Sequence, residues 1–267
     1  MDWKPEIDIH CHILPDWDDG PATLELALEM CQRAATAGLK TIVATPHIGR
    51  AFGSKNHGAD EIVGGVERLQ SELNKHKIPI KIVSGGEILM GAVDLYARLP
   101  EDLDLTYGRK GKYALIESPT PVWPDFGNHV VNLMQNAGVT PILAHPERYL
   151  NVQKDPNILE PLIRQHVLIQ VTAGAIIGEM GKQGRASART LLKNGWVAFI
   201  SSDAHDTTHA LPDQAIEETI KLVGEEAAKT IFVDNPRKML EGTRVFSVEP
   251  SNETGELDGI FKRLFKR

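Results

Sequence analysis

The sequence has 267 residues, 42% of them hydrophobic, and a formal net charge of −7. These values are typical of a globular protein, and an acidic chain without a basic run before its last few residues argues against nucleic acid as the main partner. Two cysteines are too few for a disulfide framework, and no signal core or membrane-spanning run is visible, so we expect a cytoplasmic protein that does not insert into a membrane.

Seven short apolar runs are typical of strands buried on both faces of a parallel sheet. In chain order they cover residues 7–12, 41–44, 80–83, 113–117, 141–144, 167–171 and 197–201. Helical spacing of apolar residues is found at 23–37, 59–76, 128–137, 157–165, 186–194, 213–223 and 225–232, and near 236–241. Gly38, Gly138 and Gly195 follow three of these segments, where a helix C-cap glycine belongs.

The alternation of strands and helices predicts a parallel α/β fold. A closed or distorted (β/α) barrel accounts for seven repeats without a glycine-rich dinucleotide motif, and a doubly wound open sheet is the second candidate. No change in composition marks a second domain, so residues 1–248 are predicted to form one domain. Residues 249–267 are predicted to be a flexible or loosely docked extension.

Ionisable side chains collect where the predicted strands end, which is where (β/α) barrels place their active sites. His10 and His12 alternate with Cys11 on the first strand, so both imidazoles point to the same face. Five other strand ends carry His47, Glu87, Glu117, His145 and Asp203 with His205. The sixth run ends in Gln170-Val171-Thr172 and has no ionisable residue. So many carboxylates beside imidazoles need a compensating charge, which predicts several metal ions such as Mn, Zn or Fe.

Seven short motifs, taken together, resemble those of a known enzyme family. They are Asp8-Ile9-His10-Cys11-His12, Asp18-Asp19-Gly20-Pro21, Thr45-Pro46-His47, Gly86-Glu87, Ile116-Glu117, Ala144-His145-Pro146-Glu147-Arg148 and Ser202-Asp203-Ala204-His205. The sequence resembles the polymerase-and-histidinol-phosphatase (PHP) superfamily. Within it, the sequence is most similar to the bacterial manganese-dependent protein tyrosine phosphatases of capsule and exopolysaccharide operons. The match runs in order from about residue 7 to residue 240.

The resemblance implies a distorted (β/α)7 barrel of the PHP type that holds three divalent metal ions, with manganese first and zinc or iron as alternatives. The implied ligand sets are His10, His12, Glu87 and Asp203; Glu87, Glu117 and His145; and Asp19, His47 and His205. Arg148 matches the family's catalytic arginine. Two positions depart from the family pattern: Ile48 replaces a histidine, and His209-Ala210-Leu211 stands where an arginine is common.

The expected reaction is direct hydrolysis of a phosphomonoester by water that the metal ions activate. Arg148 can hold two phosphoryl oxygens with its planar guanidinium group, and Glu87 and His205 are the other catalytic candidates. Arg50, in the loop after the second strand, is a candidate substrate contact. The cysteine route to tyrosine dephosphorylation requires an arginine six residues after the cysteine, and Trp17 occupies that position relative to Cys11.

Three other functions use similar residues. A histidinol-phosphate phosphatase or other small-molecule phosphatase shares every ligand type. A PHP nuclease should have a basic face, and a metal-binding regulator without turnover usually lacks part of the ligand set. If the chain is a tyrosine phosphatase, the resemblance points to the tyrosine-rich tail of a bacterial tyrosine kinase as its phosphotyrosine-containing partner.

Overall fold

The computed structural model describes residues 2–49, 59–96, 98–99 and 101–248. The predicted extension at 249–267 and the candidate Arg50 lie outside these residues. Each of the seven predicted strands is present, with both bounds within one residue of the prediction. They are β1 (Ile7–Cys11), β2 (Thr41–Ala44), β4 (Lys81–Ser84), β6 (Tyr113–Glu117), β7 (Thr140–Ala144), β8 (Leu168–Thr172) and β9 (Val197–Ser201).

Two short strands, β3 (His47–Ile48) and β5 (Glu87–Leu89), were not predicted. They continue β2 and β4 after interruptions at Thr45-Pro46 and Gly85-Gly86. Proline cannot donate a ladder hydrogen bond and glycine weakens a strand, so both interruptions have a local cause. All pairings are parallel, in the orders β1-β2-β4 and β3-β5-β6-β7-β8-β9. The chain therefore passes from the first sheet to the second twice, from β2 to β3 and from β4 to β5.

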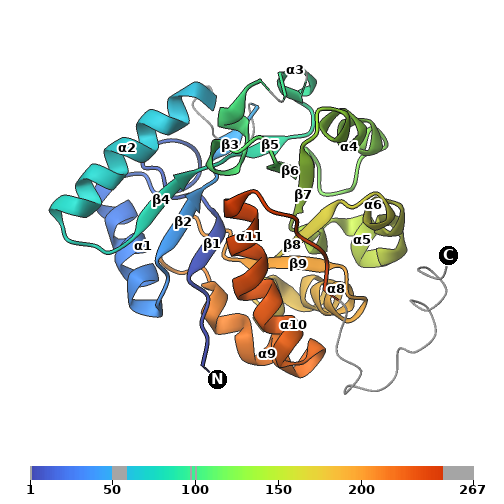
Figure 1. The fold of residues 1–267 in the computed structure, drawn as a ribbon. Coiled ribbons are helices and arrows are strands. Elements are labelled where there is room, and N and C mark those ends of the chain that lie inside the picture. The colour runs from blue at the N-terminus through green and yellow to red at the C-terminus, as the bar shows by residue number, and fades with distance from the viewer. Residues whose placement is uncertain (1, 50–58, 97, 100, 249–267) are drawn as a thin grey trace.

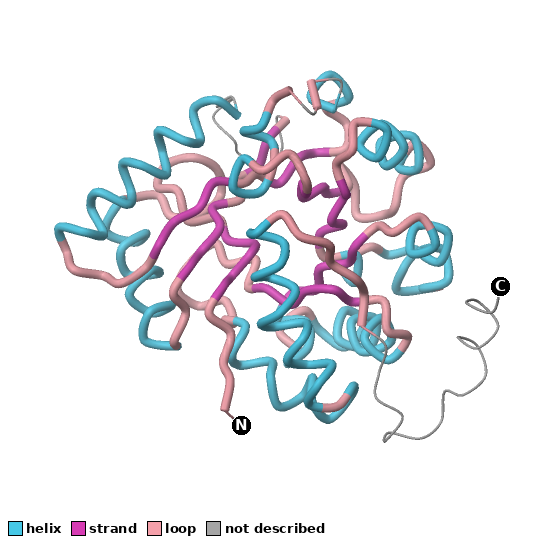
Figure 2. The backbone as a smooth tube through the Cα atoms, viewed as in Figure 1, coloured by secondary structure: helices cyan, strands magenta, loops and turns pink. Residues whose placement is uncertain are grey.

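The two sheets form one ring because the loop after β9 returns to β1. Cys11 and Ala204 form an isolated parallel bridge. The His12 N–H donates to the Ala204 carbonyl at 2.9 Å, and the Asp203 N–H donates to the His10 carbonyl at 2.8 Å. The result is a distorted (β/α)7 barrel with helices around the ring, rather than a doubly wound open sheet (Figure 1 and Figure 2).

The outer helices are α1 (Leu24–Ala37), α2 (Ala59–Lys75), α4 (Gly127–Asn136), α5 (Leu150–Lys154), α6 (Glu160–Arg164), α8 (Gly181–Lys193), α9 (Ile216–Val223) and α10 (Glu225–Lys229), with short turns at α3 (Val93–Tyr96) and α7 (Ala173–Ile177). Helix α1 shows why these segments are helical. The Thr23 side chain caps its first turn, and Gly38 ends it in the left-handed region at φ 103°. The predicted helix at 157–165 is wrong in its first half, where Pro156–Leu159 forms a 3-10 turn.

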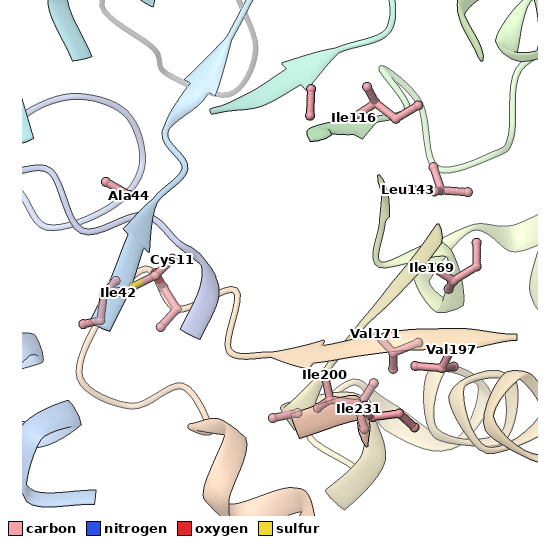
Figure 3. Close-up of a cluster of buried hydrophobic side chains, with 14 of the residues drawn as sticks. Cys11, Ile42, Ala44, Ile116, Leu143, Ile169, Val171, Val197, Ile200 and Ile231 are labelled. Atoms are coloured by element: carbon pink, nitrogen blue, oxygen red, sulfur yellow. The ribbon is translucent and has the colours of Figure 1, made fainter. Parts of the chain in front are cut away.

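Apolar side chains fill both sides of the ring. Figure 3 shows Ile42, Ile116, Leu143 and Ile169, from β2, β6, β7 and β8, among a buried cluster that also holds helix residues. A second buried cluster, which includes Ile9, lies inside the barrel. No helix in the described part of the chain is long and apolar enough to cross a membrane.

Helix α11 (Asn235–Glu241) covers the end of the barrel at which the strands begin (Figure 1). Met239 belongs to the inner cluster, together with Tyr113 at the start of β6. The buried Asn235 amide donates to the Ala198 carbonyl at 2.9 Å and to the Phe246 carbonyl at 3.0 Å, which fastens α11 to β9. The opposite end of the barrel is therefore the end available for a site.

Candidate metal centre

The side chains of all nine predicted ligands gather at the carboxyl ends of the strands. Their donor atoms form three groups, and within each group all atoms lie within 4.8 Å of one another. The groups are His12, Asp19, His47 and His205; His10, Glu87, His145 and Asp203; and His47, Glu87 and Glu117. Across residues 2–49, 59–96, 98–99 and 101–248, no other residue belongs to such a group.

The centre of the cluster is formed by the two histidines of the first strand and two carboxylates. The His10 Nε2 atom lies 3.2 Å from Asp203 Oδ1 and 3.4 Å from Glu87 Oε2. The His12 Nε2 atom lies 3.3 Å from Glu87 Oε2 and 3.6 Å from Asp203 Oδ1. The two Nε2 atoms are 3.4 Å apart, so four donor atoms face a common point.

Two further pairings extend the cluster on either side. Asp19 Oδ1 lies 3.4 Å from His47 Nε2 and 3.3 Å from His205 Nε2. On the other side, His145 Nε2 lies 2.9 Å from Glu87 Oε1. The grouping differs from the expected sets at three residues. Glu117 Oε1 lies 2.8 Å from His47 Nδ1 and is grouped with His47 rather than with His145. His145 is grouped with His10 and Asp203, and His12 with Asp19, His47 and His205.

The chemistry of this cluster fits divalent cations. Glu87 Oε2, Glu117 Oε1 and Asp203 Oδ1 are buried and make no hydrogen bond to any described residue. A buried acceptor without a donor costs about 1–3 kcal/mol, and more when it is charged. Cations held between these oxygens and the facing imidazole nitrogens would satisfy all three atoms.

The ionisable groups of the cluster shift one another's pKa values. Burial lowers the pKa of His12, but its hydrogen bond to Asp18 and the nearby Glu87 carboxylate outweigh burial and raise that pKa to about 10. Burial alone would raise the pKa of Glu87, yet the charges of His10 and His145 hold it well below its ordinary value. The pKa of Glu117 is raised above its ordinary value, first by burial and then by repulsion from the Glu87 carboxylate. Without metal, His12 therefore holds a proton that a bound cation would displace.

Arg148 stands at the edge of the cluster, in a 3-10 turn (Pro146–Arg148) after β7. Its Nη1 group donates to Asp203 Oδ2 at 3.1 Å, while 48% of the side chain is exposed. The neighbouring Glu147 is buried, and its Oε1 atom accepts from the Thr172 N–H at 2.8 Å and the Thr172 hydroxyl at 2.9 Å. These bonds hold the turn against the end of β8. The Arg148 guanidinium group therefore contacts a carboxylate of the cluster on one side and solvent on the other.

Three buried polar residues behind the cluster were not assigned from the sequence: Asp18, Glu147 and Gln170. Asp18 and Gln170 contact ring nitrogens of predicted ligands, and Glu147 holds the turn of Arg148. One signal was present for Gln170, since an amide inside an otherwise apolar strand needs a buried partner. Gln170 was not considered as part of the site because its side chain is neutral and is not a typical metal ligand.

The two departures from the family pattern lie in different surroundings. Ile48 is buried in β3, where its side chain fills the space beside Gly86. His209 lies at the rim, with its ring centre 5.6 Å from that of His205 and its Nδ1 atom 3.0 Å from Asp206 Oδ1. Only the second departure can therefore alter the outer edge of the site.

Comparisons with known proteins agree with this geometry. The family described as capsular polysaccharide synthesis, CpsB/CapC, matches residues 6–241. Tyrosine-protein phosphatase YwqE of Bacillus subtilis (strain 168) is 31% identical over 249 residues, which are 91% of this chain and 95% of YwqE. Tyrosine-protein phosphatase CpsB of Streptococcus agalactiae serotype III (strain NEM316) is 29% identical over 245 residues, which are 88% of this chain and 98% of CpsB.

Solved structures give the same grouping. A crystal structure from work on YwqE of Bacillus subtilis and CpsB of Streptococcus pneumoniae, described as unique metal-dependent tyrosine phosphatases, matches with a TM-score of 0.81 and 29% identity over 92% of this chain and 99% of that chain. The lactonase Lmo2620 from Listeria monocytogenes matches with a TM-score of 0.55 and 13% identity over 90% of this chain and 95% of its own, which is a likeness of fold alone.

Proposed function

Because the chain belongs to the CpsB/CapC family of capsular polysaccharide synthesis, we propose that it is a metal-dependent phosphatase that hydrolyses phosphotyrosine in proteins. The observation that carries the proposal is the largely buried cluster of nine histidines and carboxylates, in which three carboxylate oxygens accept no hydrogen bond from any described residue, beside a half-exposed arginine. The named phosphatase relatives cover nearly the whole chain, which supports extending their activity to it.

The proposed metal ligands are His10, His12, Asp19, His47, Glu87, Glu117, His145, Asp203 and His205. We propose three divalent ions, with manganese as the physiological metal; zinc and iron also suit nitrogen and oxygen ligands. Bound there, such ions would lower the pKa of a coordinated water and offset the charge of a phosphoryl group. Glu87 is central because its two carboxylate oxygens face different histidines, with Oε1 toward His145 and Oε2 toward His10 and His12.

Arg148 is the proposed phosphate contact. Its planar group uses one N–H to hold Asp203, which leaves further donors for phosphoryl oxygens on the exposed side. His205 is the proposed catalytic histidine at the rim. The Asp203 carbonyl can only accept, so the His205 Nδ1 atom at 2.9 Å must donate to it, and the Nε2 atom is left to face the site.

A cysteine nucleophile does not fit this site. Cys11 is buried, its Sγ atom contacts the Ala204 carbonyl at 3.6 Å, and burial raises its pKa well above the ordinary value. A neutral, buried thiol cannot attack a phosphate group. Phenolate, with a parent pKa of about 10, leaves more readily than an alkoxide, so tyrosine esters depend less on a strong general acid.

The proposed physiological substrate is the tyrosine-rich tail of a bacterial tyrosine kinase, reached on the cytoplasmic side. The family's role in capsular polysaccharide synthesis supports a substrate within that process. Manganese-loaded protein should release phosphate from phosphotyrosyl peptides far faster than from the matched phosphoseryl peptides or from histidinol phosphate. Faster turnover of histidinol phosphate would instead support the alternative of a small-molecule phosphatase.

A further inference from the structure

We propose that Asp18 and Gln170 are positioning residues that set the tautomers of His12 and His10 and thereby decide which ring nitrogens face the metal ions. The inference rests on the proposed metal centre and adds to it two residues that hold no metal themselves. Both side chains lie behind the cluster, one in the loop after β1 and the other on β8.

Gln170 contacts two ligand residues through a single oxygen. Its Oε1 atom lies 3.0 Å from His10 Nδ1 and 3.3 Å from the backbone nitrogen of His145. A backbone N–H can only donate, so the amide oxygen must face it, and the same oxygen must then accept from His10 Nδ1. The Gln170 Nε2 atom makes no hydrogen bond to any described residue, so the oxygen alone accounts for the contacts.

Asp18 repeats this arrangement for the second histidine. Its Oδ2 atom lies 2.8 Å from His12 Nδ1 and accepts from the His47 N–H at 2.9 Å. Its Oδ1 atom accepts from the Gly20 N–H at 3.0 Å. Because an ionised carboxylate only accepts, His12 must also carry its proton on Nδ1.

In both cases one oxygen accepts from the ring of one ligand and from the backbone of another. The consequence is that Nε2 is the ring atom of both His10 and His12 that can give up a proton to an incoming ion. The two Nε2 atoms are 3.4 Å apart, and both face Glu87 Oε2. The two positioning residues therefore decide which nitrogen of each ring binds the ion that displaces this proton.

The two residues differ in charge, which separates their effects. The Asp18 carboxylate makes the His12 imidazole a stronger ligand for a metal ion than a neutral partner would. Gln170 acts on His10 only through the position of its acceptor oxygen. Removing the acceptor in Gln170→Leu should weaken Mn²⁺ binding by about 10–100-fold, the usual effect of losing such a partner. Gln170→Glu keeps an acceptor oxygen and should bind Mn²⁺ at least as tightly as the wild type.

The test is Mn²⁺ titration of chelator-treated full-length protein, with free Mn²⁺ measured by electron paramagnetic resonance. Gln70→Leu is the matched control. Gln70, on α2, also bridges two backbone groups, the Ile80 carbonyl at 3.0 Å and the Ile82 N–H at 2.8 Å, but these lie at the start of β4, away from the cluster. Weaker binding in Gln170→Leu and in Asp18→Ala, which also removes the acceptor, with normal binding in Gln170→Glu and Gln70→Leu, supports the inference.

Wild-type affinity in both Gln170→Leu and Asp18→Ala overturns the inference, as does an equal loss in Gln170→Glu. Asp18 lies in a loop rather than in a buried strand, so Asp18→Ala decides the matter even where Gln170→Leu fails to fold; thermal melts of the metal-free proteins identify that case. If the wild type binds no Mn²⁺, the proposed metal centre fails and the inference with it, whereas unchanged affinities in variants of a metal-binding wild type overturn the inference alone.

Discussion

Arg148 contacts a buried carboxylate of the cluster and is also exposed to solvent. Burial lowers the pKa of its guanidinium group, but Asp203, Glu147 and Glu87 outweigh that effect and raise it, so the group stays cationic at every working pH. A fixed cation beside buried carboxylates attracts a phosphate dianion without any proton transfer. Its planar shape also matches two phosphoryl oxygens, which a lysine ammonium cannot do.

Arg148→Ala should lower kcat/KM for a phosphotyrosyl peptide by about 10²–10³-fold, the effect of removing one charge-stabilising donor. Arg148→Lys should recover part of this loss, because it restores charge without the planar pair of donors. Arg164→Ala is the control, since Arg164 pairs with Glu160 on the exposed surface of α6. Unchanged turnover in Arg148→Ala, with normal metal content, would contradict the assignment.

The thiols give a second residue-scale prediction. Burial raises the pKa of Cys31 to about 12 and that of Cys11 well above its ordinary value. Since an acid with a raised pKa stays neutral until the pH approaches that value, thiolate should be scarce in the folded protein at pH 8. Iodoacetamide should therefore label neither cysteine until denaturant is added, as followed by mass spectrometry. Rapid labelling of Cys11 in folded protein would reopen the cysteine route.

At the scale of elements, the interruptions in two strands place ligands. After Thr45-Pro46, β2 continues as β3, which begins with His47. After Gly85-Gly86, β4 continues as β5, which begins with Glu87. His47 and Glu87 are direct partners in the β3–β5 register. The ladder between these two short strands thus brings an imidazole and the central carboxylate side by side.

Gly86→Ala tests this placement, because an added Cβ atom would lie 2.1 Å from Ile48 Cδ1 and 3.1 Å from its Cγ1. We expect a loss of about 1–3 kcal/mol in the free energy of unfolding, measured with urea, and weaker Mn²⁺ binding as Glu87 shifts. Gly91→Ala is the control: its Cβ would meet nothing within 4 Å, so the change should stay within about 0.5 kcal/mol. Equal effects from both substitutions would show that the close packing at Gly86 does not place the ligand.

At the scale of the whole molecule, the metal centre joins the parts of the chain. Its ligands come from the loop after β1 and from strand ends around the ring, so bound ions would link the two sheets and the seam between β1 and β9. Without ions, the same carboxylates remain buried beside one another at a cost in stability. Metal binding and folding should therefore be coupled.

Chelation should lower the melting temperature, and Mn²⁺ should restore it in a concentration-dependent way. At Mn²⁺ about 100 times the Kd, each site should add about 2.7 kcal/mol to the free energy of unfolding. Differential scanning calorimetry across a Mn²⁺ series measures this directly, with Ca²⁺ as a comparison ion that prefers all-oxygen ligands. A melting temperature independent of Mn²⁺ would rule out ions held by buried groups of the folded state.

Much of this architecture could be predicted from the sequence, for physical reasons that also mark the limit. Runs buried on both faces are apolar throughout, so all seven main strands were found, and side chains at their carboxyl ends had to meet at one edge of the barrel. The short β3 and β5 carry too few residues for a periodic signal. The contact between Glu117 and His47 depends on side-chain rotamers, and the role of Gln170 on a neutral hydrogen bond, and residue type reveals neither.

The central claim is that the nine-residue cluster holds metal ions that support phosphotyrosine hydrolysis. The most direct test is a Mn²⁺ titration of chelator-treated protein, in which bound metal and phosphate released from a phosphotyrosyl peptide are measured in the same samples. We predict that turnover is absent without metal and rises together with site occupancy, and that Glu87→Gln, which alters the shared ligand, lowers both. Full turnover in metal-free protein, or saturated metal binding without any phosphate release, would contradict the account.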